Sequence, residues 1–125
     1  MADTLQLLQR FHEALQREDY DAARTTLADN FSFEGWFGTF AAVEPYMELV
    51  KKLGAFAGTV VVRKVFVDGN DAAVFYDRRT IRHDDVPCAT WVTVRDGRIA
   101  TIRVICDSRP FAELWAAAEA GKPPS

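Results

Sequence analysis

Two β-rich segments carry carboxylates and guanidinium groups at alternate positions. Asp77 and Arg79 are two residues apart in one segment, and Arg103 and Asp107 are four apart in the other. Because strand side chains alternate between faces, the members of each pair share a face. If the four groups met in an apolar cavity, they would shift one another's pKa values, and one carboxyl group could stay protonated as an acid. Such a set could activate water, open an epoxide or form an enolate without a cofactor.

The same four charges could instead have a purely structural role. They could form a network of cross-strand ion pairs, or they could lie on a solvated outer face. The turn at Asp96–Gly97 affects the geometry, because a two-residue turn pairs Trp91 with Ile102, whereas a bulge at Gly97 pairs Trp91 with Thr101. The two registers place Trp91 on opposite sides relative to Asp107.

The composition is that of an ordinary globular domain. The chain has 125 residues, of which 49% are hydrophobic, 12% aromatic and 26% charged. We expect one domain over residues 1–118. The segment 119–125, which contains Gly121, Pro123 and Pro124, is expected to be a disordered tail.

Charge and cysteine use exclude several classes of partner. The net charge of −3 offers no basic surface for nucleic acid. Neither a leader peptide nor an apolar run of about 18 residues is present, which predicts no membrane partner and a cytoplasmic location. Cys88 and Cys106 lack the spacing of zinc ligands, so we expect reduced thiols and no metal site. We also expect no cofactor.

Hydrophobic periodicity predicts helices first and strands last. We expect helices over about 4–17, 21–27, 40–53 and 110–116, one strand over 30–36, and a four-strand meander over 59–68, 72–83, 88–95 and 98–107. This order predicts an α+β fold in which helices cover one face of an antiparallel sheet.

The chain resembles the nuclear transport factor 2-like superfamily, which includes SnoaL-like polyketide cyclases, ketosteroid isomerases and limonene epoxide hydrolase. The resemblance covers about residues 4–116 and rests on the element order, on the segment 27–34 (LADNFSFE) and on the segments 95–99 (RDGRI) and 103–107 (RVICD). It implies a cystatin-like, cone-shaped fold, with a curved antiparallel sheet wrapped on N-terminal helices around a deep apolar pocket. It also implies a homodimer formed through the convex face of the sheet.

The resemblance suggests roles for individual residues. The positions of the ketosteroid isomerase groups fall at Phe11, near Gly35 and near Ala89, so the Asp and Tyr side chains of that mechanism are missing. Asp107 ends the last strand, where cyclases and epoxide hydrolases of this fold carry a catalytic aspartate. It would be the acid or base, with Asp77 as its partner.

Other residues complete the expected site. Arg79 and Arg103 would orient charge, although Asp77 and Arg79 stand in the opposite order to the epoxide hydrolase pair. The resemblance favours the bulged register, with Trp91 and Asp107 both inside. Candidate pocket-lining residues are His12, Phe33, Tyr46, Phe75 and Trp91; each could instead be an ordinary core residue.

This orientation exposes an apolar stripe of Ile102, Val104 and Cys106 on the convex face, which a second subunit should cover. In a monomer, the stripe would be core, and Arg103 and Asp107 would face solvent. The leading hypothesis is a cofactor-independent acid/base cyclase, isomerase or hydrolase acting on a small hydrophobic oxygenated molecule. The alternatives are a non-catalytic ligand-binding module and an interaction domain.

Overall fold

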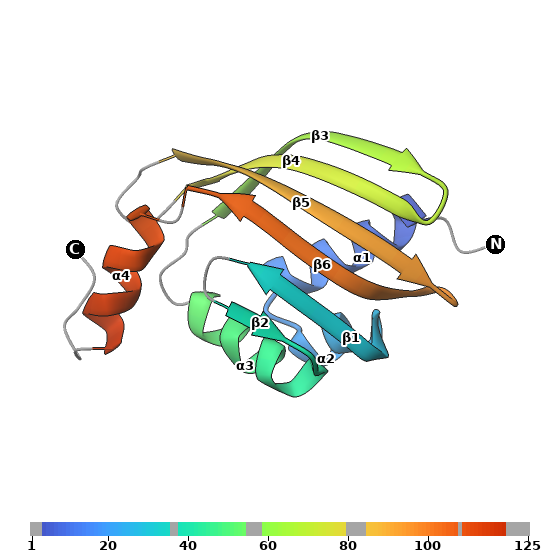
Figure 1. The fold of residues 1–125 in the computed structure, drawn as a ribbon, viewed down its shortest axis with the longest axis horizontal. Coiled ribbons are helices and arrows are strands. Elements are labelled where there is room, and N and C mark those ends of the chain that lie inside the picture. The colour runs from blue at the N-terminus through green and yellow to red at the C-terminus, as the bar shows by residue number, and fades with distance from the viewer. Residues whose placement is uncertain (1–3, 36–37, 55–58, 80–84, 108, 120–125) are drawn as a thin grey trace.

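A computed structural model describes residues 4–35, 38–54, 59–79, 85–107 and 109–119. Its helices are α1 (Thr4–Gln16), α2 (Tyr20–Thr25), α3 (Val43–Gly54) and α4 (Arg109–Glu119). Its strands are β1 (Leu27–Gly35), β2 (Gly38–Phe40), β3 (Thr59–Asp68), β4 (Asp71–Arg79), β5 (Asp85–Arg95) and β6 (Arg98–Cys106). The expected element order is confirmed, with β2 as an additional short strand (Figure 1). The predicted tail lies almost entirely outside the described residues.

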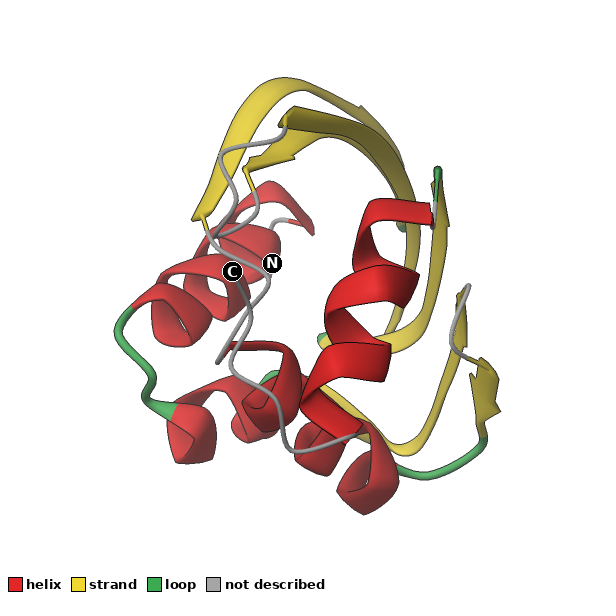
Figure 2. Ribbon diagram, turned by 90° about the vertical axis from the view of Figure 1, so that its left-hand side faces the viewer, coloured by secondary structure: helices red, strands yellow, loops and turns green. Residues whose placement is uncertain are grey.

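The strands form one curved, open sheet in the order β2-β1-β6-β5-β4-β3. Figure 2 shows helices on the concave side of this sheet. The α+β prediction is therefore confirmed, but the sheet is mixed, because β1 runs parallel to β6 while the other neighbours are antiparallel. A parallel pair needs a long connection between its strands, and here α3 and other strands separate β1 from β6 in the chain.

The core lies between the concave face and the helices. Leu7 of α1, Phe31 of β1 and Ile99 of β6 are fully buried. The rings of Phe31 and Tyr46 are 4.9 Å apart, which packs α3 against β1. The Thr4 hydroxyl donates a 2.9 Å hydrogen bond to the Gly69 carbonyl and thereby joins the start of α1 to the turn between β3 and β4.

The hairpin between β5 and β6 contains both a tight turn and a bulge. Asp96 and Gly97 have φ angles of 52° and 75°, as expected for a two-residue turn closed by Arg95 and Arg98. The bulge lies farther along β6. Ile99 pairs with Val94 and Thr101 pairs with Thr93, so Ala100 is the extra residue on β6.

Because of this bulge, the pairing of β5 with β6 differs from both predicted registers. Trp91 pairs with Arg103 rather than with Ile102 or Thr101, so both registers expected from the sequence are wrong. The physical reason is that Ile99 and Ala100 are consecutive and both buried, at 0% and 2% exposure. A regular strand would turn one of them outward, whereas a bulge lets both pack inward.

No helix among the described residues is long and apolar enough to cross a lipid bilayer.

Candidate functional site

The two predicted residues of β4 lie on the convex face and bind local partners. Asp77 accepts a 2.8 Å hydrogen bond from Nε of Arg63. Arg79 forms an exposed ion pair with Asp85, with Nε 2.9 Å from Oδ1.

The other two predicted residues, Arg103 in β6 and Asp107 just after it, are exposed. Asp107 accepts hydrogen bonds from both the side chain and the backbone of Arg109, which lower its pKa to about 2. Arg103 lies 5.1 Å from the ring centroid of Trp91. The expectation that the four charged groups converge in one pocket is therefore wrong in this structure.

The orientation follows from the burial of the opposite face. Ile102 is 4% exposed and Val104 and Cys106 are partly buried, so this stripe faces the helices and its alternate residues face outward. This is the orientation that the sequence predicts for a monomer.

The predicted binding residues divide between the two faces. Phe33 and Tyr46 are buried at 3% and 6% exposure, and His12 is half-buried on α1. Phe75 and Trp91 are instead 44% and 49% exposed on the convex face. The Trp91 Nε1 donates a 3.0 Å hydrogen bond to Asp71 at the same surface.

A different polar group gathers on the concave face, which we call the concave-face cluster. Its members come from α1, α3 and the three strands β4, β5 and β6. They are His12, Tyr46, Tyr76, Arg78, Cys88, Thr90 and Cys106.

Strand pairing places the sheet members of the cluster side by side. Tyr76 pairs directly with Cys88, and Cys88 pairs with Cys106. Arg78 follows Tyr76 two residues later on the same face. The Thr90 hydroxyl donates a 3.0 Å hydrogen bond to the Tyr76 hydroxyl.

Arg78 supplies the positive charge of the cluster. It is half-buried, and it forms no hydrogen bond or ion pair with any residue that the structure describes. Its charge lies close enough to affect the ionisation of His12 on α1 and of Tyr46 on α3. A guanidinium group that lacks a protein carboxylate is free to bind an anionic or carbonyl oxygen of a ligand.

Tyr46 adds a hydroxyl group with unused hydrogen-bonding capacity. The residue is 6% exposed, and its hydroxyl has no hydrogen-bond partner within the described parts of the chain. Buried polar groups are hydrogen-bonded in the great majority of cases, so this hydroxyl is a second group available to a ligand.

Burial sets the protonation states in the cluster. It lowers the pKa of His12 from 6.5, with the Arg78 charge acting in the same direction. Burial also raises the pKa of Tyr46 and of Tyr76. At neutral pH the cluster therefore combines a neutral imidazole that can accept a proton with two phenols and a guanidinium that can stabilise an oxyanion.

Sequence reasoning missed Tyr76 and Arg78 because it placed the alternate residues of β4 inside. The sequence did contain a signal for the observed orientation. The apolar stripe of β6 indicates which of its faces is buried, and directly paired residues of β5 and β4 must lie on the same face of the sheet.

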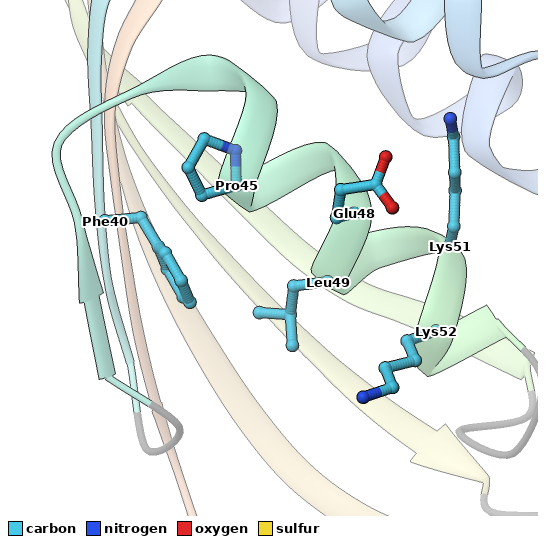
Figure 3. Close-up of a pocket in the computed structure, with 6 residues that line it drawn as sticks. All are labelled: Phe40, Pro45, Glu48, Leu49, Lys51 and Lys52. Atoms are coloured by element: carbon cyan, nitrogen blue, oxygen red, sulfur yellow. The ribbon is translucent and has the colours of Figure 1, made fainter.

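An open surface depression lies between β2 and α3 (Figure 3), and none of the residues that line it belongs to the concave-face cluster. Phe40 and Leu49 form its apolar floor, with Pro45, Glu48, Lys51 and Lys52 around them. Within the described residues, no group of three or more His, Cys, Asp or Glu side chains is arranged to hold a metal ion.

Comparisons with known proteins define the family. The sequence profile described as SnoaL-like domain matches residues 8–102. A nuclear transport factor 2-like protein of unknown function from Cytophaga hutchinsonii is 30% identical, with a TM-score of 0.79 over 90% of this chain and 96% of that chain. No curated protein matches the chain.

Two further solved structures share the fold at lower identity. A protein from Sinorhizobium meliloti proposed to be a polyketide cyclase is 19% identical, with a TM-score of 0.74 over 82% of this chain and 99% of that chain. TerC, crystallised with polyporic acid, is 16% identical, with a TM-score of 0.76 over 89% of this chain and 96% of that chain. The chain belongs to the SnoaL-like group of the nuclear transport factor 2-like superfamily.

Proposed function

We propose that the protein binds a small hydrophobic, oxygenated molecule between the concave face of the sheet and helices α1 and α3. The observation that carries this proposal is the half-buried Arg78, which has no carboxylate partner among the described residues. Beside it, the buried Tyr46 hydroxyl also lacks a partner there. Together they would bind an acidic or carbonyl oxygen of the ligand, while apolar neighbours would contact its carbon skeleton.

Two further facts support a ligand at this face. Val62 pairs with Tyr76 and is 42% exposed, which indicates that solvent reaches the concave side of the sheet near the cluster. TerC, which has the same fold, was crystallised with polyporic acid.

The cluster also supports acid/base catalysis. In this proposal the neutral imidazole of His12 removes a proton from the carbon next to a carbonyl group of the substrate. Arg78, Tyr46 and Tyr76 would stabilise the negative charge that develops on the carbonyl oxygen. Return of the proton to another carbon gives an isomerase, and attack of the enolate on a second carbonyl gives a cyclase.

A non-catalytic ligand-binding module is the second candidate. It is favoured by the lack, among the described residues, of any hydrogen-bond partner that would orient the His12 imidazole. Catalytic bases are commonly oriented by a third group. Binding without turnover is the result that this candidate predicts.

The experiment that separates the two candidates is proton exchange in deuterated water. The protein would be mixed with a panel of hydrophobic ketones and keto acids, and incorporation of deuterium next to the carbonyl would be followed by NMR. An enzyme should accelerate exchange for at least one compound, and His12→Gln should abolish the acceleration while the compound still binds. Saturable binding with no exchange would support the binding module, and no binding to the wild-type protein would contradict both.

We also propose that two copies associate through the convex face. The stripe expected there, Ile102, Val104 and Cys106, lies inside. The convex face instead carries Phe66, Phe75, Trp91 and Ile105, which are 44–73% exposed and which we call the convex-face patch. An exposed set of large apolar side chains is typical of an interface. The cytoplasmic location stays a prediction from the sequence.

A further inference from the structure

The two cysteines of the chain meet on the concave face. Cys88 on β5 and Cys106 on β6 are far apart in the sequence but are direct partners in the antiparallel register. Both are free thiols, and the chain contains no other cysteine. Neither the predicted ligand site nor the proposed base requires this arrangement, so it points to a separate role.

The backbone geometry suits a disulfide bond. Directly opposed residues of an antiparallel pair have Cα atoms about 4.5–5.5 Å apart. Disulfides span Cα separations of about 4.4–6.8 Å. The strands would therefore not have to move apart or together for the two sulfurs to bond, although the fixed strand geometry restricts the dihedral angles of the bond and favours easy reduction.

The two thiols differ in access and in ionisation. Cys88 is 7% exposed and has the Val86 carbonyl within 3.4 Å of its sulfur, whereas Cys106 is more exposed. Hydrogen bonding from Cys88 lowers the pKa of the Cys106 thiol, and the charge of Arg78 acts in the same direction. The pKa of Cys88 is raised by the same interaction and by burial. Cys106 is thus the thiol that meets an incoming reagent first.

We propose that Cys88 and Cys106 are a redox-active dithiol that closes reversibly to a cross-strand disulfide by exchange with a small organic disulfide. The Cys106 thiolate attacks one sulfur of the reagent, forms a mixed disulfide and releases one thiolate. Cys88 then loses its proton and attacks the Cys106 sulfur, which releases the second thiol. The protein loses two protons and two electrons, which together are two hydrogen atoms, and the reagent takes them up as it is reduced to two thiols.

The test uses oxidised glutathione as the reagent and the folded, full-length protein. After acid quenching, the intact mass should show the loss of two hydrogen atoms and no bound glutathione. Trypsin without reductant should release residues 83–95 linked to residues 104–125, because no Lys or Arg that trypsin can cleave divides either peptide. Dithiothreitol should restore two free thiols per chain.

The single variants test the order of the steps. Cys88→Ser should retain one glutathione on Cys106, because the resolving thiol is missing. Cys106→Ser should react at least about tenfold more slowly, because Cys88 is buried. Circular dichroism would show whether each variant is folded. If a variant does not fold, the mass and peptide measurements on the wild-type protein still test whether the disulfide forms.

Three results would overturn the proposal. The first is a wild-type protein that keeps glutathione without the linkage between Cys88 and Cys106. The second is a disulfide that joins two chains instead of closing within one. The third is a folded protein that does not react, although the same protein reacts once urea has unfolded it. None of these measurements involves the proposed ligand or reaction. The redox inference would therefore still hold if the proposed function were disproved.

Discussion

Replacing Arg78 by Met should remove the anion-binding group of the concave face while leaving its apolar contacts largely intact. Arg78 has no ion pair to a described carboxylate, so the substitution leaves no known buried negative charge without a partner. The fold should therefore be retained. The neighbouring Arg79→Met is a matched control, because it removes the same charge from the convex face, where Arg79 pairs with Asp85.

The size of the effect follows from the burial of the guanidinium group. Hydrogen bonds to charged groups contribute about 1.5–3 kcal/mol, which corresponds to roughly 10- to 150-fold in affinity. Because Arg78 is only half-buried, solvent screens part of this energy and we expect the lower end, about 10- to 30-fold.

The assay is a fluorescence titration with two probes that share their aromatic rings. One probe, 8-anilinonaphthalene-1-sulfonate, carries an anionic group, and the other, N-phenyl-1-naphthylamine, does not. Arg78→Met should weaken binding of the sulfonate by the stated factor and change the affinity of the neutral probe by less than about twofold. Arg79→Met should change neither.

Equal losses for the two variants would contradict a specific role for Arg78, since they would show an effect of net charge alone. Equal losses for both probes in Arg78→Met would show that the variant had disturbed packing instead. The control also tests the role that the sequence suggested for Arg79.

Four further substitutions test separate features of the molecule. Burial lowers the pKa of His12 below its unfolded value of 6.5, so the unfolded state binds more protons and the free energy of unfolding should fall as the pH falls below about 6.5. Urea denaturation should therefore show a flatter pH profile for His12→Gln than for the wild type, and parallel profiles for the two proteins would count against this role of His12. Gly35→Ala places a Cβ atom 2.7 Å from Cζ of the buried Phe33 ring, so urea denaturation should show a loss of about 1–3 kcal/mol, and an unchanged midpoint would be the opposite result. Ile105→Lys puts a charge at a position that is 73% exposed on the convex face, so sedimentation velocity should show a wild-type dimer and a monomeric variant; a monomeric wild type would disprove the dimer. Asp107→Asn should not change probe binding, because Asp107 is exposed and bound to Arg109; a loss of binding would restore the site expected from the sequence.

The elements were predictable because local composition determines them. The segment 59–68 is rich in β-branched residues, and Asp96–Gly97 is a strong two-residue turn signal, so the structure has the strand and the turn where the sequence places them. The short strand β2 and the parallel pairing of β1 with β6 depend on contacts between distant segments, which local patterns do not report.

The main error of the sequence prediction was which face of each strand points toward the helices. The error arises because strand side chains alternate with a period of two residues, and this alternation is the same whichever face is buried. In β4, each face carries aromatic and charged residues, with Phe75, Asp77 and Arg79 on one side and Tyr76 and Arg78 on the other. Alternation shows which residues share a face but not which face is inside.

The burial of β6 resolves this ambiguity. Its apolar stripe packs against the helices and fixes the phase of β5 and β4 through direct pairing. His12 and Tyr46 were identified correctly as facing the interior because helical periodicity marks one apolar side of α1 and α3. The bulge at Ala100 could have been suspected from two consecutive apolar residues after the turn.

A crystal structure of the protein with bound 8-anilinonaphthalene-1-sulfonate is the sharpest test of the concave-face ligand site. We expect the sulfonate within hydrogen-bond distance of the Arg78 guanidinium and the rings against the concave face, near Tyr46 and Tyr76. A probe bound instead to the convex-face patch, with its sulfonate on Arg103 beside Trp91, would contradict this site and move ligand binding to the opposite face of the sheet.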